Sequence, residues 1–143
     1  MREGFPLPDV DWEPTREFWA AAAREELRMP RCTACRRFHW YPQGACSHCG
    51  EESVAWERMS GCARLFTWVV LEHAFLPQYA GNLPFVSALV TLDEDERVRL
   101  PTRIVECEPA TLAIDQPMEV CFRTLRFDGV EGEVLAPFFR PVG

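Results

Sequence analysis

The sequence contains no lysine, and all 15 basic residues are arginines. A chain without lysine forms no Schiff base with a carbonyl or with pyridoxal phosphate, and it lacks the lysine of a phosphate-binding P-loop. No apolar run approaches the roughly 20 residues that cross a bilayer, and residues 1–6 do not resemble a signal peptide. We therefore expect a cytoplasmic protein that has no membrane partner.

The common catalytic motifs are also missing from the sequence. It contains no G-x-S-x-G elbow, no G-x-G-x-x-G loop and no H-E-x-x-H helix. Of its three histidines, His39, His48 and His73, the last follows an apolar strand beside Glu72 and is either a base or a solvated residue at the strand end. The acidic run at 93–96 reads as a solvated turn. The net charge of −7 disfavours a nucleic-acid partner. We expect that the chain alone carries out no chemistry.

The first 30 residues contain one predicted helix. After an extended segment at 1–13, the helix is expected to begin near Pro14 or Thr15 and to be stopped by Pro30. Phe18, Trp19 and Leu27 recur at helical spacing along it. The two aromatic side chains either pack on their own domain or dock into a partner, and the sequence leaves both alternatives open.

After Ser60-Gly61 the chain becomes strand-like. β-Branched and aromatic residues favour short strands, and Asp128-Gly129 is typical of a hairpin turn between the last two. Because no long helix separates them, we expect a small antiparallel barrel or sandwich. The expected strands lie at 64–73, 85–92, 97–100, 104–107, 118–126 and 133–139.

Four of the seven cysteines form two C-x-x-C pairs, Cys32/Cys35 and Cys46/Cys49. Each pair directs two sulfurs towards one point, and four thiolates suit a tetrahedral zinc ion, although a rubredoxin-like iron site uses the same ligands. Four ligands leave no open position, so the metal is structural, and we expect chelation to unfold residues 31–56. His39 and His48 are rival ligands that we expect to be exposed instead.

The other three cysteines are Cys62, Cys107 and Cys121. They lie in apolar sequence, where a free cysteine commonly acts as a small buried hydrophobic residue. We therefore expect all three to be buried, with no part in the metal site.

Positive charge gathers between the helix and the first cysteine pair, where Phe38, Trp40 and Tyr41 follow directly. Arginine forks suit phosphates and carboxylates, and aromatic rings stack on bases. The cluster is therefore a solvated patch, a site for nucleotide or coenzyme A phosphates, or a surface for an acidic partner. The candidate phosphate-binding residues are Arg31, Arg36 and Arg37, with Arg24 and Arg28 close by.

The order of these motifs resembles a known family. Phe18-Trp19 and the two cysteine pairs are followed by Trp56, Ser60-Gly61 and a terminal Phe139-x-Pro141. This order is similar to that of acyl-CoA-associated proteins that join a rubredoxin-like zinc ribbon to an OB-fold. The resemblance spans about residues 14–141. It implies a mainly β protein with an extended segment and helix at 1–30, a zinc ribbon at 31–58 and an antiparallel OB-fold barrel at 59–143.

The same resemblance implies a function. Such proteins are accessory subunits of thiolase-fold enzymes, and one kind accompanies a lipid-transfer-protein-type aldolase that cleaves steroid side-chain CoA thioesters. It implies a hetero-oligomer in which the partner carries the chemistry and this chain helps to hold the acyl-CoA. The docking surface would include Phe18, Trp19, Trp40 and Tyr41. The alternatives are a single-stranded nucleic-acid-binding module, since zinc ribbons and OB-folds recur in such proteins, and an independent acyl-CoA thioesterase or lyase.

Overall fold

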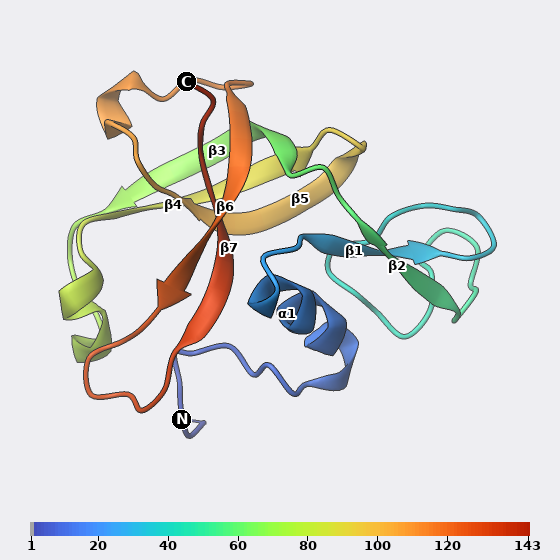
Figure 1. Ribbon diagram of the computed structural model, residues 1–143, viewed down its shortest axis with the longest axis horizontal. Coiled ribbons are helices and arrows are strands. Elements are labelled where there is room, and N and C mark those ends of the chain that lie inside the picture. Colours follow the sequence, from blue (N-terminus) through green and yellow to red (C-terminus); the bar gives the residue numbers. More distant parts are fainter. Residues whose placement is uncertain (1) are drawn as a thin grey trace.

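The computed structural model describes residues 2–143 and is mainly β. Figure 1 shows helix α1, a two-stranded ribbon formed by β1 and β2, and a closed barrel formed by β3 to β7. The predicted fold class, a helix followed by a four-cysteine ribbon and a small barrel, is confirmed. None of the helices within residues 2–143 has the length and apolar character needed to span a membrane.

The elements follow one another without long interruptions. The helix is α1 (Arg16–Ala23), preceded by the 3-10 turn η1 (Glu13–Thr15). Two further 3-10 turns are η2 (Pro77–Asn82) and η3 (Pro109–Thr111). The strands are β1 (Arg28–Cys32), β2 (Val54–Arg58), β3 (Cys62–Leu71), β4 (Phe85–Leu92), β5 (Asp95–Ile104), β6 (Pro117–Leu125) and β7 (Val134–Pro141).

Helix α1 begins where the sequence predicts but ends earlier. Glu25 adopts a left-handed conformation with φ of 59°, and the amides of Glu25 and Glu26 donate to the carbonyls of Ala22 and Ala21. This pair of hydrogen bonds is a Schellman motif, which ends a helix and reverses the chain. Leu27 therefore lies beyond the helix. The prediction that the helix continues towards Pro30 is wrong, because Pro30 belongs to β1.

The N-terminal segment is folded into turns where an extended chain was expected. Met1 lies outside the described residues. From there on, the amide of Phe5 donates to the carbonyl of Arg2, and the amide of Leu7 donates to that of Gly4. Leu7 is 8% exposed, so these turns bring an apolar side chain back onto the protein.

The barrel strands are arranged in the order β3-β4-β5-β7-β6, and β6 closes on β3. Neighbouring strands are antiparallel except β5 and β7, which are parallel and pair only at Ile104 and Phe139. The strand predicted at 104–107 is wrong, because residues 105–107 lie outside the strands. β5 contains the strand predicted at 97–100 and extends it to Ile104. Pro101 lies inside it, and a proline without an N–H is tolerated because most of one β5 edge has no paired strand.

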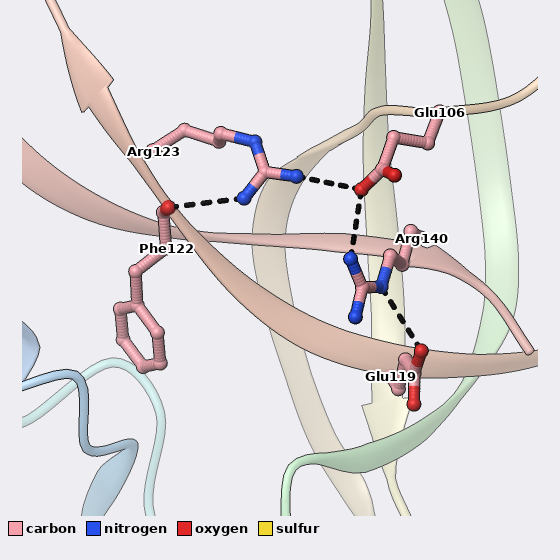
Figure 2. A network of polar contacts seen from close by, with 5 residues as sticks. All are labelled: Glu106, Glu119, Phe122, Arg123 and Arg140. Atoms are coloured by element: carbon pink, nitrogen blue, oxygen red, sulfur yellow. Dashed lines mark hydrogen bonds and ion pairs between the residues drawn. The ribbon is translucent and has the colours of Figure 1, made fainter.

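Figure 2 shows a polar network beside this short β5–β7 contact. The carboxylate of Glu106, just after β5, accepts from Arg123 on β6 at 2.6 Å and from Arg140 on β7 at 3.0 Å. Arg140 also donates to Glu119 at 2.9 Å. Four side chains from two strands and one loop thus reinforce the edge where backbone pairing is least extensive.

One apolar core joins the barrel to the helix and ribbon. Its most buried members, each at most 1% exposed, come from the barrel and from β1. Phe18 of α1 and Leu27 belong to the same cluster. Burying one such side chain stabilises the fold by roughly 1.5–3 kcal/mol, so the helix and β1 are held on the barrel by apolar packing. The members are Met29, Leu65, Val90, Val98, Leu100, Met118 and Phe139.

The three cysteines outside the C-x-x-C pairs differ in burial. Cys121 is 7% exposed, as predicted, and Cys107 is half-buried. The prediction is wrong for Cys62, which is exposed. Cys62 begins β3, where successive side chains point to opposite faces, and its neighbour Ala63 occupies the inward position.

Candidate metal centre and aromatic surface

The four cysteines of the two pairs converge although 17 positions separate the first from the last. Cys32 ends β1, Cys35 lies in the turn after it, and Cys46 and Cys49 lie in a second turn before β2. Their sulfurs all lie within 4.8 Å of one another, with Cys32–Cys49 at 3.5 Å and Cys35–Cys46 at 3.6 Å. Sulfurs about 2.3 Å from a tetrahedral ion lie about 3.8 Å apart, so the cluster fits such an ion.

Each turn presents backbone amides to its own thiolates. The amide of His48 lies 3.4 Å from the sulfur of Cys46. Donation from the amides of Cys49 and His48 lowers the pKa of Cys46 to about 5, and the amides of Cys35 and Ala34 lower the pKa of Cys32. Hydrogen bonds to the charged form of a thiol favour ionisation, which a metal ligand requires.

The pKa of Cys49 shows why four ionised cysteines need a bound cation. The backbone of Glu51 lowers its pKa, but the hydrogen bond with Cys32, burial, and the hydrogen bonds with Cys35 and Cys46 outweigh this and raise the pKa to about 11. Four adjacent thiolates repel one another, so without a cation they share protons. A bound metal deprotonates its thiol ligands outright. The site is thus a four-thiolate metal-binding cluster.

The two rival histidines lie outside the cluster, whose members among residues 2–143 are the four cysteines. His48 is exposed, as predicted. The prediction is wrong for His39, which is half-buried, with its Nε2 atom buried and without a hydrogen-bond partner in the described chain. The amide of His39 donates to the carbonyl of Pro30, which pulls the ring in beside β1.

The four predicted docking aromatics have different environments. Phe18 is 4% exposed and lies in the core, 5.0 Å from the ring of Trp19 and 4.6 Å from that of Trp40. Trp19 and Trp40 are half-buried, whereas Tyr41 is 53% exposed. Phe18 therefore packs on its own domain, and the other three side chains reach the surface.

Tyr41 has a neighbour that the sequence analysis missed. Trp12, 44% exposed, stacks on Tyr41 with ring centroids 5.7 Å apart. Trp12 lies in the segment before the helix, and no local pattern brings position 12 to position 41. We define the aromatic surface as Trp12, Trp19, Trp40 and Tyr41. These four residues line one shallow cavity of about 560 Å³.

Two of the three candidate phosphate-binding arginines use their guanidinium groups within the protein. Arg31 and Arg36 both bind the carboxylate of Glu57, at 3.0 Å and 2.9 Å. Arg31 also lies over the ring of Phe38, 4.5 Å from its centroid. Arg37 is half-buried and its carbonyl accepts from the amide of Cys32. Glu57 thus neutralises part of the charge that the sequence offered to a phosphate, and phosphate recognition here stays a prediction.

A cysteine-ligated ribbon joined to a closed five-stranded barrel defines the class, that of zinc-ribbon and OB-fold proteins. Two family models match adjoining segments of the chain. The rubredoxin-like zinc ribbon domain of ChsH2 matches residues 19–55, and the C-terminal OB-fold domain of ChsH2 matches residues 56–123. The chain belongs to this ChsH2 (DUF35) family.

Relatives of the chain are found in two archaea. It is 26% identical over 114 residues to a DUF35 domain-containing scaffold protein of Methanocaldococcus jannaschii, covering 78% of this chain and 79% of that protein. It is 28% identical over 120 residues to a protein of the same description in Methanothermobacter thermautotrophicus, covering 82% and 88%.

Two solved structures share the fold. A chain of an Ltp2–ChsH2(DUF35) aldolase aligns with a TM-score of 0.75 and 28% identity, over 94% of this chain and 98% of that one. A DUF35 protein of unknown function from Sulfolobus solfataricus aligns with a TM-score of 0.61 and 12% identity, over 94% and 89%. The second likeness concerns the fold alone.

Proposed function

We propose that this protein is a non-catalytic accessory subunit that binds and supports a thiolase-fold acyl-CoA enzyme. Within that class we propose a lipid-transfer-protein-type retro-aldolase that cleaves steroid side-chain CoA thioesters. The observation that carries the proposal is the likeness to a chain of the Ltp2–ChsH2(DUF35) aldolase, which extends through helix, ribbon and barrel. In this proposal the catalytic groups lie on the partner, and an acyl-CoA is the substrate of the complex.

The metal in this proposal is a structural zinc ion held by Cys32, Cys35, Cys46 and Cys49. The sulfur spacing and the amide donors of both turns support it. Four thiolates complete a tetrahedron and leave no position for water or substrate. Elemental analysis should find one zinc per chain, whereas iron with the same ligands would colour the protein, and the absence of both metals would contradict the assignment.

The aromatic surface is the proposed docking site for the enzyme subunit. Tryptophan and tyrosine dominate binding energy at protein interfaces because they bury large areas and lose little side-chain entropy. Here they lie over the junction of α1 with the ribbon, and Tyr41, which stacks on Trp12, belongs to the loop between the two cysteine pairs. Loss of the metal would therefore disturb the docking site as well as the ribbon.

Co-expression with a thiolase-like protein encoded beside this chain tests the proposal. The two should elute as one complex, and the partner's acyl-CoA cleavage should depend on this chain. Trp12→Ala and Tyr41→Ala should each weaken the complex about tenfold or more, because truncating an interface hot spot costs about 2 kcal/mol. Ile114→Ala serves as the control, since Ile114 is 70% exposed on the loop before β6.

Three outcomes would overturn the proposal. The first is that the two proteins elute separately and the partner works unaided. The second is turnover of an acyl-CoA by the purified chain, which would establish the thioesterase or lyase alternative. The third is salt-dependent binding of a single-stranded oligonucleotide, which would establish a nucleic-acid-binding module in its place.

A further inference from the structure

Arg103 on β5 is surrounded by aromatic rings. Its guanidinium lies 3.8 Å from the ring centroid of Phe85, 5.7 Å from that of Phe138 and 5.8 Å from that of Phe127. The side chain is half-buried, and burial lowers the pKa of Arg103. The guanidinium of Arg103 thus stacks on Phe85, with two further aromatic rings close by.

The hydrogen-bonding capacity of Arg103 is largely unused. A guanidinium carries five N–H donors, and within residues 2–143 the one acceptor bound by Arg103 is Oδ1 of Asn82, at 2.9 Å. No carboxylate of the described chain lies within 4.0 Å of it, although most arginines here form such pairs. An enclosed cation without an anionic partner favours an anionic ligand.

A cavity of about 350 Å³ opens beside this guanidinium. Its walls are mostly apolar, with Leu71, Leu76, Leu83 and Phe85 among them, and no carboxylate lines it. We call this space the Arg103 cavity. A second cavity that Arg103 also lines has Glu72, Glu106 and Glu108 in its walls, and their negative charge disfavours an anion there. Because carboxylates line the second cavity and none lines the Arg103 cavity, an anion is favoured in the Arg103 cavity.

The wall formed by η2 is held in place by the turn after β6. The amide of Gly81 donates to Asp128 at 2.8 Å, the side chain of Asn82 donates to the carbonyl of Arg126 at 3.0 Å, and the amide of Asp128 donates to the carbonyl of Gln78 at 3.0 Å. A Cβ on Gly81 would lie 2.7 Å from an Asp128 oxygen, so glycine permits this approach. The cavity is therefore largely preformed, which lowers the entropy cost of binding.

We propose that the Arg103 cavity binds a small monocarboxylate with an aromatic or short aliphatic body. The carboxylate accepts from the guanidinium of Arg103, and the apolar body lies against Leu71, Leu76 and Phe85. One arginine matches one negative charge, and a volume of 350 Å³ lies at the small end of ligand pockets. Figure 1 shows η2 on the side of the barrel away from β1 and β2, so this site is separate from the metal cluster.

Titration of the full-length metal-bound protein with 2-naphthoate tests the proposal by calorimetry and by amide NMR. We expect saturable binding that shifts the amide signals of residues 71–87. The uncharged 2-naphthamide should bind at least about tenfold more weakly, because a hydrogen bond to a charged group contributes about 1.5–3 kcal/mol. The dianion 2-naphthyl phosphate should bind no more tightly than the carboxylate.

Variants distinguish the contribution of the Arg103 charge to binding from that of the cavity volume. Arg103→Gln should abolish binding, whereas Arg99→Gln should leave it unchanged, since Arg99 lies on the same strand and stacks on one exposed ring, that of Phe66. Ser87→Leu fills the cavity and keeps Arg103, so it should block binding even if Arg103→Gln fails to fold. The proposal is overturned if naphthoate and naphthamide bind equally, if Ser87→Leu binds as the wild type does, or if millimolar naphthoate does not bind.

Discussion

The ribbon and the barrel are stabilised in different ways. Between residues 31 and 56 the buried apolar side chains are those of Cys32 and Cys46, two of the metal ligands. The barrel buries a continuous set of large side chains, with Phe139 at 0% exposed and Val98 at 1%. The ribbon therefore depends on its metal, whereas the barrel has an apolar core of its own.

A short chain can therefore hold two regions that are stabilised in different ways. A metal site supplies binding free energy to a segment that cannot bury enough apolar area, and β1 connects that segment to the barrel core through Met29, which is 0% exposed. Disturbing one region should therefore leave most of the other intact.

Removal of the metal should have the largest effect. Chelation, or Cys46→Ser, should unfold residues 31–56, because structural zinc contributes on the order of 10 kcal/mol to ribbons of this kind. Hydrogen exchange should show loss of protection in the ribbon while the amides of β4 and β5 stay protected. Cys62→Ser is the control, since Cys62 is exposed and outside the cluster. Simultaneous unfolding of the barrel would contradict the independence of the two regions.

Truncation of the barrel core should have the next largest effect. Phe139→Ala should reduce the free energy of unfolding by about 3–5 kcal/mol, because it leaves a cavity at a fully buried site. Urea unfolding followed by near-ultraviolet circular dichroism measures the loss. The folded variant should still contain one metal ion per chain. Loss of the metal at urea concentrations below the unfolding transition would show that the ribbon depends on the barrel core.

The junction between the regions offers a smaller test. Gly61 has a φ of +86°, and an added Cβ would lie 2.4 Å from Cγ1 of Val120. Gly61→Ala should therefore cost about 1–3 kcal/mol of unfolding free energy through backbone strain and overpacking. Gly129→Ala has a positive φ of +71° but no neighbour within 4 Å, so it should cost less. Equal midpoints of thermal unfolding for the two variants would contradict this account.

Acid should weaken the ion pairs of Glu106 beside the β5–β7 contact, with a modest effect on stability. The arginines, Arg140 first and Arg123 next, lower the pKa of Glu106 below 4.5. A lowered carboxylate pKa adds stability above the unfolded pKa, and this stability is lost as the pH falls through the folded pKa. Between pH 6.5 and pH 3, wild type should therefore lose more of its urea midpoint than Glu106→Gln does. Parallel curves would show that the network of Figure 2 contributes nothing measurable.

The parts of the fold that follow from local sequence were predictable. The start of the helix, the hairpin turn before β7 and the four metal ligands each depend on residue types at fixed short spacing. The errors have tertiary causes. The helix ends early because Leu27 and Met29 are buried with β1 against the barrel, and β5 continues through Pro101 because most of one strand edge is unpaired.

The contacts of the aromatic surface and of the arginines also have tertiary causes, so the sequence did not predict them. Sequence order placed Tyr41 beside the cysteines but gave no reason to pair it with Trp12, and it left open whether Phe18 packs inside or outside. In the sequence the arginines form a cluster that could bind a phosphate. In the fold, Glu57 forms ion pairs with both Arg31 and Arg36. The domain limits predicted at 30/31 and 58/59 stay predictions, as does the role of these arginines towards coenzyme A.

The ligand set and the class of fold follow from local patterns in the chain. Two C-x-x-C pairs specify a four-thiolate site through bond geometry within each turn, and alternating apolar residues specify strands with one buried face. Folding decided which charges have no oppositely charged neighbour among residues 2–143, as Arg103 shows, and which aromatic rings meet at the surface. Such pairings join residues distant in the chain, and their energies arise only when the closed barrel brings those residues together.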